Sequence, residues 1–141
     1  MRVFYIFKIK DEFKYLYKNN ESTLYNILKQ IYYLPNEEIE YAKTLLNQLV
    51  NDIDKEYIDR DLFIKLHQKM PYSKRGEINY MNNLYKDEIS KLIVKNKYIK
   101  IETETNFSSF FEILSNYDNN FFVCDFDYLD FFFIDSIKVL V

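Results

Sequence analysis

Residues 2–9, RVFYIFKI, decide the fold, because they read as a strand whose two faces are both apolar. β-Branched and aromatic residues favour strands, and successive side chains of a strand point to opposite faces. A strand that is apolar on both faces belongs in the interior of a sheet, so we expect an interior strand here. Its two expected faces are Val3, Tyr5, Phe7 and Ile9 on one side, and Phe4 and Ile6 on the other.

The region after this strand carries the signals of helices. Asp11 is a candidate N-cap for a short helix that stops near Asn19. Apolar residues recur with i, i+3, i+4 and i+7 spacing after Ser22, and Pro35 ends that pattern. A further helix opens at Asn36. We expect helices over residues 11–18, from 22 to about 32, from 36 onward and over 61–68, with a polar connection over 51–61 and helical spacing again over 78–85.

The C-terminal part changes to the period of two that strands show. Residues 90–95 and 98–104 predict a hairpin that turns at residues 96–97. A short helix over 107–116 and two final strands, FFVCDFDYLD and FFFID, follow. This order predicts a single α+β domain over 1–141: an N-terminal strand, a helical middle and a strand-rich C-terminal part that forms one mixed sheet with helices packed on it.

The composition excludes several kinds of site. Gly76 is the only glycine, and phosphate-binding loops and nucleophile elbows need several. His67 and Cys124 are also single, whereas a zinc site needs about three or four nitrogen and sulfur ligands. A lone cysteine on the apolar side of a predicted strand is typical of a small core residue. We therefore expect no cofactor, no metal and no catalytic residue.

The longest apolar runs are too short for a membrane span or a signal peptide. The run near the N-terminus covers residues 3–7, and the run near the C-terminus covers residues 131–134. A spanning helix needs about 20 apolar residues, and a signal peptide needs a longer apolar stretch with small residues after it. We therefore expect a cytoplasmic protein without a membrane partner.

Charge is divided unevenly along the chain. Residues 101–137 contain eight acidic residues and no lysine or arginine, and the remainder of the chain carries a net charge of +5. Such asymmetry can mark a surface for a charged partner, and it can equally arise from strands with one wet face that happens to carry aspartates. Both interpretations stay open at this point.

Asp125 and Asp127 offer one candidate for catalysis. Their i, i+2 spacing places both carboxylates on one face of a strand, and two carboxylates with water can hold Mg²⁺. A small metal-dependent enzyme is therefore the alternative function. The simpler interpretation is two solvated aspartates opposite a buried row of Phe122, Cys124, Phe126 and Tyr128.

The lysine-rich hairpin at 91–100 offers a further alternative, a nucleic-acid-binding module. An isoelectric point near 5.3 and lysines scattered among acidic residues argue against it, because non-specific binding depends on concentrated positive charge. We expect no direct contact with nucleic acid.

Aromatic residues make up 19% of the chain, and the 14 tyrosines exceed what one small core holds comfortably, because each buried hydroxyl needs a partner. Phe13 and Tyr17 are spaced i, i+4 on the first predicted helix. Periodicity favours a core position for this pair, and exposure would make it an anchor for a partner protein.

Three stretches resemble a known family: FYIFKIKDEFKYLYKNNESTLYNIL at the start, then IKIETETNFSSFFEIL and FFVCDFDYLDFFFID near the end. The resemblance is to SirA, the sporulation inhibitor of replication of endospore-forming Firmicutes. It covers most of the chain and is strongest in residues 2–32 and 98–135. Family members bind the N-terminal domain of the replication initiator DnaA and block initiation at the chromosomal origin. The resemblance implies a protein-binding inhibitor without an active site.

The resemblance also implies which residues meet DnaA. Aromatic residues of the first helix face the initiator in the family, and by position these are Phe13 and Tyr17. A second contributing helix corresponds to the one that opens at Asn36, where Asn47 and Val50 are the matching positions. Position 50 is aromatic in the family, so a valine there offers less contact area.

Overall fold

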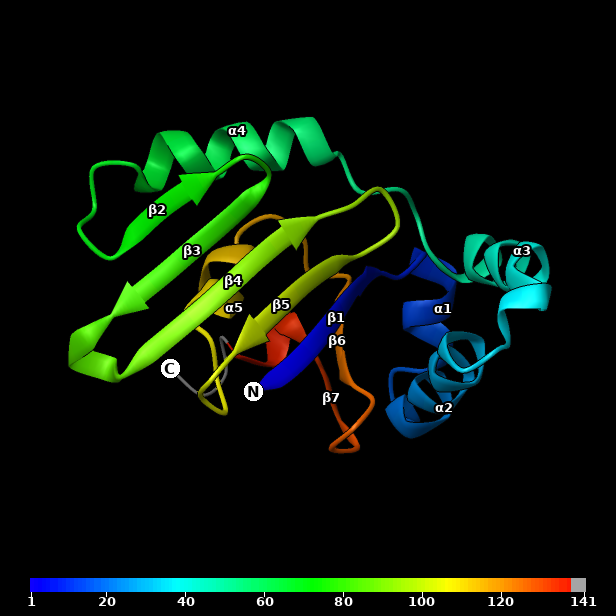
Figure 1. Cartoon of the computed structure of the whole chain (residues 1–141). Coiled ribbons are helices and arrows are strands. Elements are labelled where there is room, and N and C mark those ends of the chain that lie inside the picture. Colours follow the sequence, from blue (N-terminus) through cyan, green and yellow to red (C-terminus); the bar gives the residue numbers. More distant parts are fainter. Residues whose placement is uncertain (138–141) are drawn as a thin grey trace.

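The computed structural model describes residues 1–137, and within that range it has a seven-stranded sheet flanked by helices (Figure 1). The predicted α+β class is confirmed, with one strand first, helices in the middle and strands at the C-terminal part. The strands are β1 (Arg2–Lys8), β2 (Tyr72–Arg75), β3 (Ile78–Asn83), β4 (Glu88–Val94), β5 (Ile99–Thr103), β6 (Phe121–Asp125) and β7 (Asp130–Phe133). The helices are α1 (Asp11–Leu16), α2 (Glu21–Tyr32), α3 (Ile39–Leu49), α4 (Lys55–Leu66) and α5 (Phe110–Leu114), with the 3-10 turns η1 (Asn36–Glu38), η2 (Leu84–Lys86) and η3 (Ile134–Ser136).

The first strand lies inside the sheet, as its two apolar faces predicted. The strand order is β2-β3-β4-β5-β1-β6-β7, so β1 lies between β5 and β6. In this register Tyr5 stands opposite Lys100 on one side and Cys124 on the other. All the pairings among the described residues are antiparallel, which makes the sheet antiparallel rather than mixed.

Each face of the sheet has its own apolar cluster. On one face, Phe4 and Ile6 pack with residues of α4 and α5, among them Leu62 and Phe111. The opposite face carries Phe7 and further aromatic residues of β6 and β7, which pack against α2, α3 and α1. Burial of apolar surface on both sides of β1 therefore holds two helical layers to one sheet.

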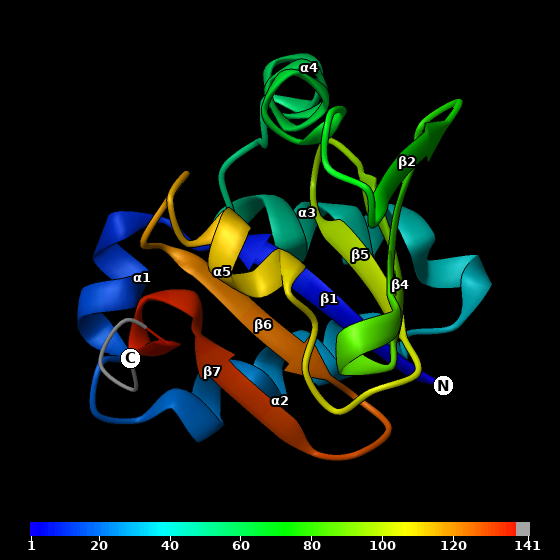
Figure 2. The ribbon, with the colours of Figure 1, turned by 90° about the vertical axis from the view of Figure 1, so that its left-hand side faces the viewer.

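The layer made of α1, α2 and α3, here called the helical layer, covers only part of its face. Figure 1 shows these three helices together at one end of the sheet, and no helix in front of β2, β3, β4 and β5. In Figure 2 α4 is seen almost along its axis, and α5 lies on the opposite side of the sheet from α2 and α3. We call β1, β6 and β7 the covered half and β2 to β5 the open half.

Three predictions of local structure were wrong. Asp11 is the first residue of α1 and not its N-cap, which is Lys10. The helical spacing over residues 78–85 belongs to β3 and η2. The buried face of β3 includes the polar residue Asn79, so the strand does not show a plain apolar alternation. The Nδ2 of Asn79 donates to the Leu92 carbonyl at 3.3 Å, and the Tyr72 hydroxyl donates to its Oδ1 at 2.6 Å. The polar stretch 51–61 contains the first half of α4, whose start Asp54 caps by accepting from the Tyr57 amide.

The acidic segment 101–137 is largely paired within the chain. Because β1 lies beside β6, basic residues near the N-terminus meet aspartates near the C-terminus. The ion pairs that join the two ends are Arg2 with Asp125 and Asp130, Lys8 with Asp118, and Lys14 with Asp135. The charge asymmetry of the sequence therefore reflects internal pairing across the sheet. Among residues 1–137 no helix is long and apolar enough to cross a membrane.

Candidate functional site

The helical layer exposes several large apolar side chains to solvent. Helix α1 has no fully buried residue, although Phe13, Tyr15 and Leu16 are half of its length. Tyr15 is 84% exposed and Leu16 is 62% exposed. Further exposed apolar side chains of this layer are Tyr32 and Tyr33 at the end of α2, and Ile39 and Tyr41 at the start of α3.

Phe13 and Tyr17 are neither fully buried in the core nor fully exposed, which were the two alternatives that the sequence left open. Both are half-buried and pack against the cluster that contains Phe7, Ile9 and Leu24. One side of each ring thus contacts the core, and the rest faces solvent. Tyr15 and Leu16, which lie between them in the sequence, point outward. The exposed pair Tyr15 and Leu16 was missed by the sequence analysis, and its only signal was its position between the two inward positions.

Asn47 and Val50 come together at the end of α3 but differ in exposure. Asn47 is exposed. Val50 is 2% exposed, and its backbone forms a bridge with Ile9 at the end of β1. The resemblance implied a surface contact at position 50, whereas the structure places this side chain in the core. Val50 therefore holds the end of α3 against the sheet.

A groove of about 410 Å³ runs between α2 and α3. Gln48, which follows Asn47, and Leu49, which precedes Val50, both contribute to its lining. The remaining lining is mainly apolar, so the groove could accept an apolar side chain. Its residues are Ile27, Gln30, Ile31, Leu34, Tyr41, Leu45, Gln48 and Leu49.

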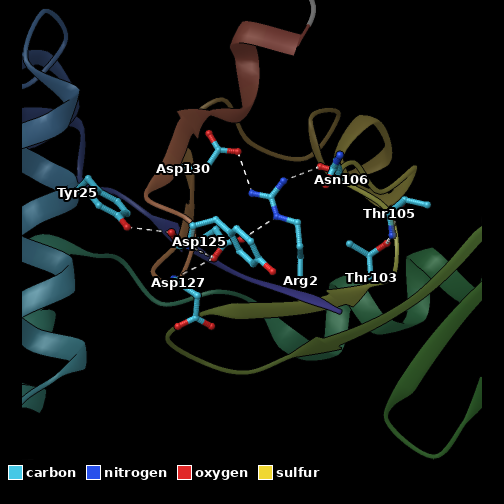
Figure 3. Close-up of polar contacts among 9 residues, drawn as sticks. Arg2, Tyr25, Thr103, Thr105, Asn106, Asp125, Asp127 and Asp130 are labelled. Atoms are coloured by element: carbon cyan, nitrogen blue, oxygen red, sulfur yellow. Dashed lines mark hydrogen bonds and ion pairs between the residues drawn. The ribbon is translucent and has the colours of Figure 1, made fainter.

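Asp125 and Asp127 do not act as a carboxylate pair. Asp125 is fully buried at the end of β6, where its Oδ2 accepts from the Nε of Arg2 at 2.9 Å (Figure 3). Its Oδ1 accepts from the amides of Asp127 and Tyr128 at 3.0 and 3.1 Å. The side chain of Asp127 is exposed. The interpretation as two solvated aspartates was therefore wrong for Asp125, which closes the turn into β7.

Arg2 joins three segments that are far apart in sequence. Besides Asp125, it binds the Oδ2 of Asp130 at 3.1 Å and the carbonyl of Asn106 at 3.3 Å (Figure 3). Burial disfavours its charge, but the hydrogen bonds and charges of Asp125 and Asp130 outweigh burial and raise the pKa of Arg2. This cluster therefore fixes the β6–β7 turn to the start of β1 and is a structural device. Within residues 1–137 no group of three or more histidine, cysteine, aspartate or glutamate side chains is arranged to hold a metal ion.

Cys124 and His67, the other residues considered for chemistry, make packing contacts. Cys124 is buried in the covered half, and burial raises the pKa of its thiol well above the usual value, which disfavours the reactive thiolate. His67 ends α4 in an exposed position, where its ring stacks on Phe63. The Nδ1 of His67 lies 2.9 Å from the carbonyl oxygen of Phe63, which is a backbone contact within α4.

A model of a known protein family matches most of this chain. The family model described as sporulation inhibitor of replication protein SirA matches residues 2–138. A search of the curated proteins finds no match. The matched family is one of regulatory inhibitors rather than a known family of enzymes, and its name describes an inhibitor of replication in sporulation. Because the match covers nearly the whole chain, this protein belongs to the SirA family of sporulation inhibitors of replication.

Proposed function

We propose that this protein inhibits replication in the cytoplasm by docking its helical layer on the N-terminal domain of DnaA. The observation that carries the proposal is α1, a helix of six residues with three apolar side chains and no fully buried residue. A helix that contributes so little to the core is available for a partner. Exposed aromatic residues on one element are typical anchors of protein interfaces.

The proposed contact set follows from exposure. Phe13 and Tyr17 offer the outer part of rings whose inner part is held by the core, so they lose little side-chain freedom when a partner covers them. Asn47 offers an exposed amide near the groove between α2 and α3. Val50 would support this surface from beneath, because it is buried. Tyr15 adds an exposed ring on the same helix as Phe13.

The proposed mechanism is steric competition. The N-terminal domain of DnaA, as the family resemblance implies, drives oligomerisation and helicase loading. An inhibitor that covers an apolar patch of that domain excludes its other partners by mass action. The chain then needs no active site, and its effect depends on its concentration relative to the dissociation constant.

Calorimetric titration of the chain with the N-terminal domain of DnaA tests this proposal. We expect Tyr17→Ala to weaken binding by about 2 kcal/mol or more, which is roughly 30-fold, because central aromatic anchors have effects of this size. Tyr15→Ala is a second variant whose side chain has no core to disturb, and we expect it to weaken binding as well. Circular dichroism would check that both variants keep the fold.

Tyr85→Ala is the matched control, because Tyr85 is fully exposed in η2 at the other end of the molecule. We expect it to bind DnaA as the unmodified protein does. If Tyr15→Ala and Tyr17→Ala both retain full affinity, the helical layer is not the docking surface.

A further inference from the structure

The uncovered face of the open half gathers cations that are scattered in the sequence. Arg75 in β2, Lys91 in β4 and Lys100 in β5 have the same orientation as Tyr5 and Tyr80, because the register pairs Tyr80 with Lys91 and Tyr5 with Lys100. Arg75 reaches this face one strand further out, opposite Ile78. Figure 1 shows no helix in front of these strands.

Tyr80 on this face is accompanied by two cations, and Tyr5 of β1, in the covered half, is accompanied by one. The Arg75 guanidinium and the Lys91 ammonium both lie 5.9 Å from the ring centroid of Tyr80. The Lys100 ammonium lies 6.0 Å from the ring centroid of Tyr5. The Tyr5 ring also packs against the helical layer, so Tyr80 is the ring of these two that lies on the open half.

Most of this positive charge is not neutralised within the chain. Among residues 1–137, neither Arg75 nor Lys91 takes part in an ion pair. Lys100 lies 3.3 Å from Glu102, which also stands opposite Lys91 across the strands. Lys55 of the neighbouring α4, in contrast, is paired with Asp59 and Glu77. The open face is therefore a local positive surface on a protein with net charge −3.

We propose that this open face binds single-stranded nucleic acid, with phosphates at Arg75 and Lys91 and a base on Tyr80. Cations that follow a strand's backbone and aromatic rings that stack its bases are the two elements of such sites. An acidic protein segment would need the cations but would gain little from the ring, so the pairing of Tyr80 with two cations favours nucleic acid. The site is separate from the helical layer and does not depend on DnaA binding.

Fluorescence anisotropy with a labelled oligothymidylate of about 20 nucleotides tests the proposal on the full chain. At about 50 mM salt we expect measurable binding that weakens steeply toward about 200 mM. Tyr80→Ala should weaken binding about 5- to 100-fold through lost stacking, and Lys91→Glu should weaken it at least about 10-fold. Glu102→Gln, which removes the negative charge beside Lys91, should strengthen it several-fold.

The controls separate this site from general charge effects. Lys43→Glu makes the same charge change as Lys91→Glu on an exposed position of α3, and we expect it to leave oligothymidylate binding unchanged. The open-face variants should retain full affinity for DnaA. A polyglutamate peptide is the competing probe. Absence of oligothymidylate binding at low salt, equal effects of both lysine variants, or polyglutamate binding that Tyr80→Ala leaves unchanged would each overturn the proposal.

Discussion

The covered and open halves of the sheet differ in how their strands are solvated, and the sequences of the strands show the same difference. All five residues of β6 in the covered half are buried, and its sequence is almost continuously apolar. In β4 of the open half, buried and accessible residues alternate along the strand. Both strands share the layer of α4 and α5 on one side. The helical layer on the other side, present only over the covered half, makes the difference.

The largest expected effect lies in the covered half. Phe122→Ala removes a fully buried ring that contacts the rings of Phe131 and Phe133 between sheet and helical layer. We expect the free energy of unfolding to fall by about 3–5 kcal/mol, because lost transfer energy and a residual cavity add. Urea unfolding followed by circular dichroism measures this. A loss below about 1 kcal/mol would mean that the two layers are not closely packed.

The Arg2 cluster should give the next largest effect. Asp125→Ala removes the acceptor of three hydrogen bonds and leaves the half-buried Arg2 with Asp130 as its remaining carboxylate partner, so we expect a loss of about 3 kcal/mol. Asp125→Asn retains an oxygen for the amides of Asp127 and Tyr128 and should lose about half as much. Equal losses in the two variants would show that the turn hydrogen bonds contribute nothing beyond the charge. The same urea experiment gives both values.

Alkaline pH should lower the free energy of unfolding through ionisation of Tyr25 in the covered half. Burial raises the pKa of its hydroxyl to about 12, and the hydroxyl donates to the Asp125 carbonyl at 2.9 Å. Since the unfolded chain ionises near the ordinary value of about 10, the stabilisation is complete below pH 10 and is lost as pH rises toward 12.

We therefore expect the urea midpoint to fall between pH 9 and pH 11.5, and to fall less in Tyr25→Phe, which cannot ionise at this position. Tyr72, whose pKa burial also raises to about 12, is present in both proteins and contributes equally. An identical fall in both proteins would show that Tyr25 is not protected from ionisation.

The smallest expected effect is on the uncovered face of the open half. Ile89 lies there and is 42% exposed, so Ile89→Thr keeps the β-branched shape and loses little buried area. We expect the stability to change by no more than about 0.5 kcal/mol. A loss comparable to that of Phe122→Ala would mean that another part of the protein covers this face in solution.

The sequence predicted the parts of the fold whose patterns are local. The interior position of β1 followed from its two apolar faces, and the β4–β5 hairpin followed from its alternation. The errors at β3 and at the start of α4 arose where burial was polar or where a helix faced water. Asn79 is buried only because Tyr72 and Leu92 supply hydrogen-bond partners, and those lie on other strands.

The candidate site was predictable in part. The i, i+4 spacing of Phe13 and Tyr17 marked α1 as an aromatic helix, and the structure leaves both rings half-buried. The burial of Val50 was not predictable, because it depends on the bridge to Ile9, a residue 41 positions earlier in the chain. Nor was the role of Asp125, which depends on Arg2 at the opposite end of the sequence.

By itself the sequence determined the element types over most of the chain, the antiparallel neighbours joined by short turns, and membership of a family of replication inhibitors. These depend on periodicity, propensity and motif, which act over a few residues. Only the tertiary structure decided that Asp125 is a buried partner of Arg2, that Tyr15 faces outward, and that Lys91 and Arg75 share one face with Tyr80. The physical reason is that charge pairing and solvent exposure depend on which strands become neighbours, and strand order joins residues that are far apart in the chain.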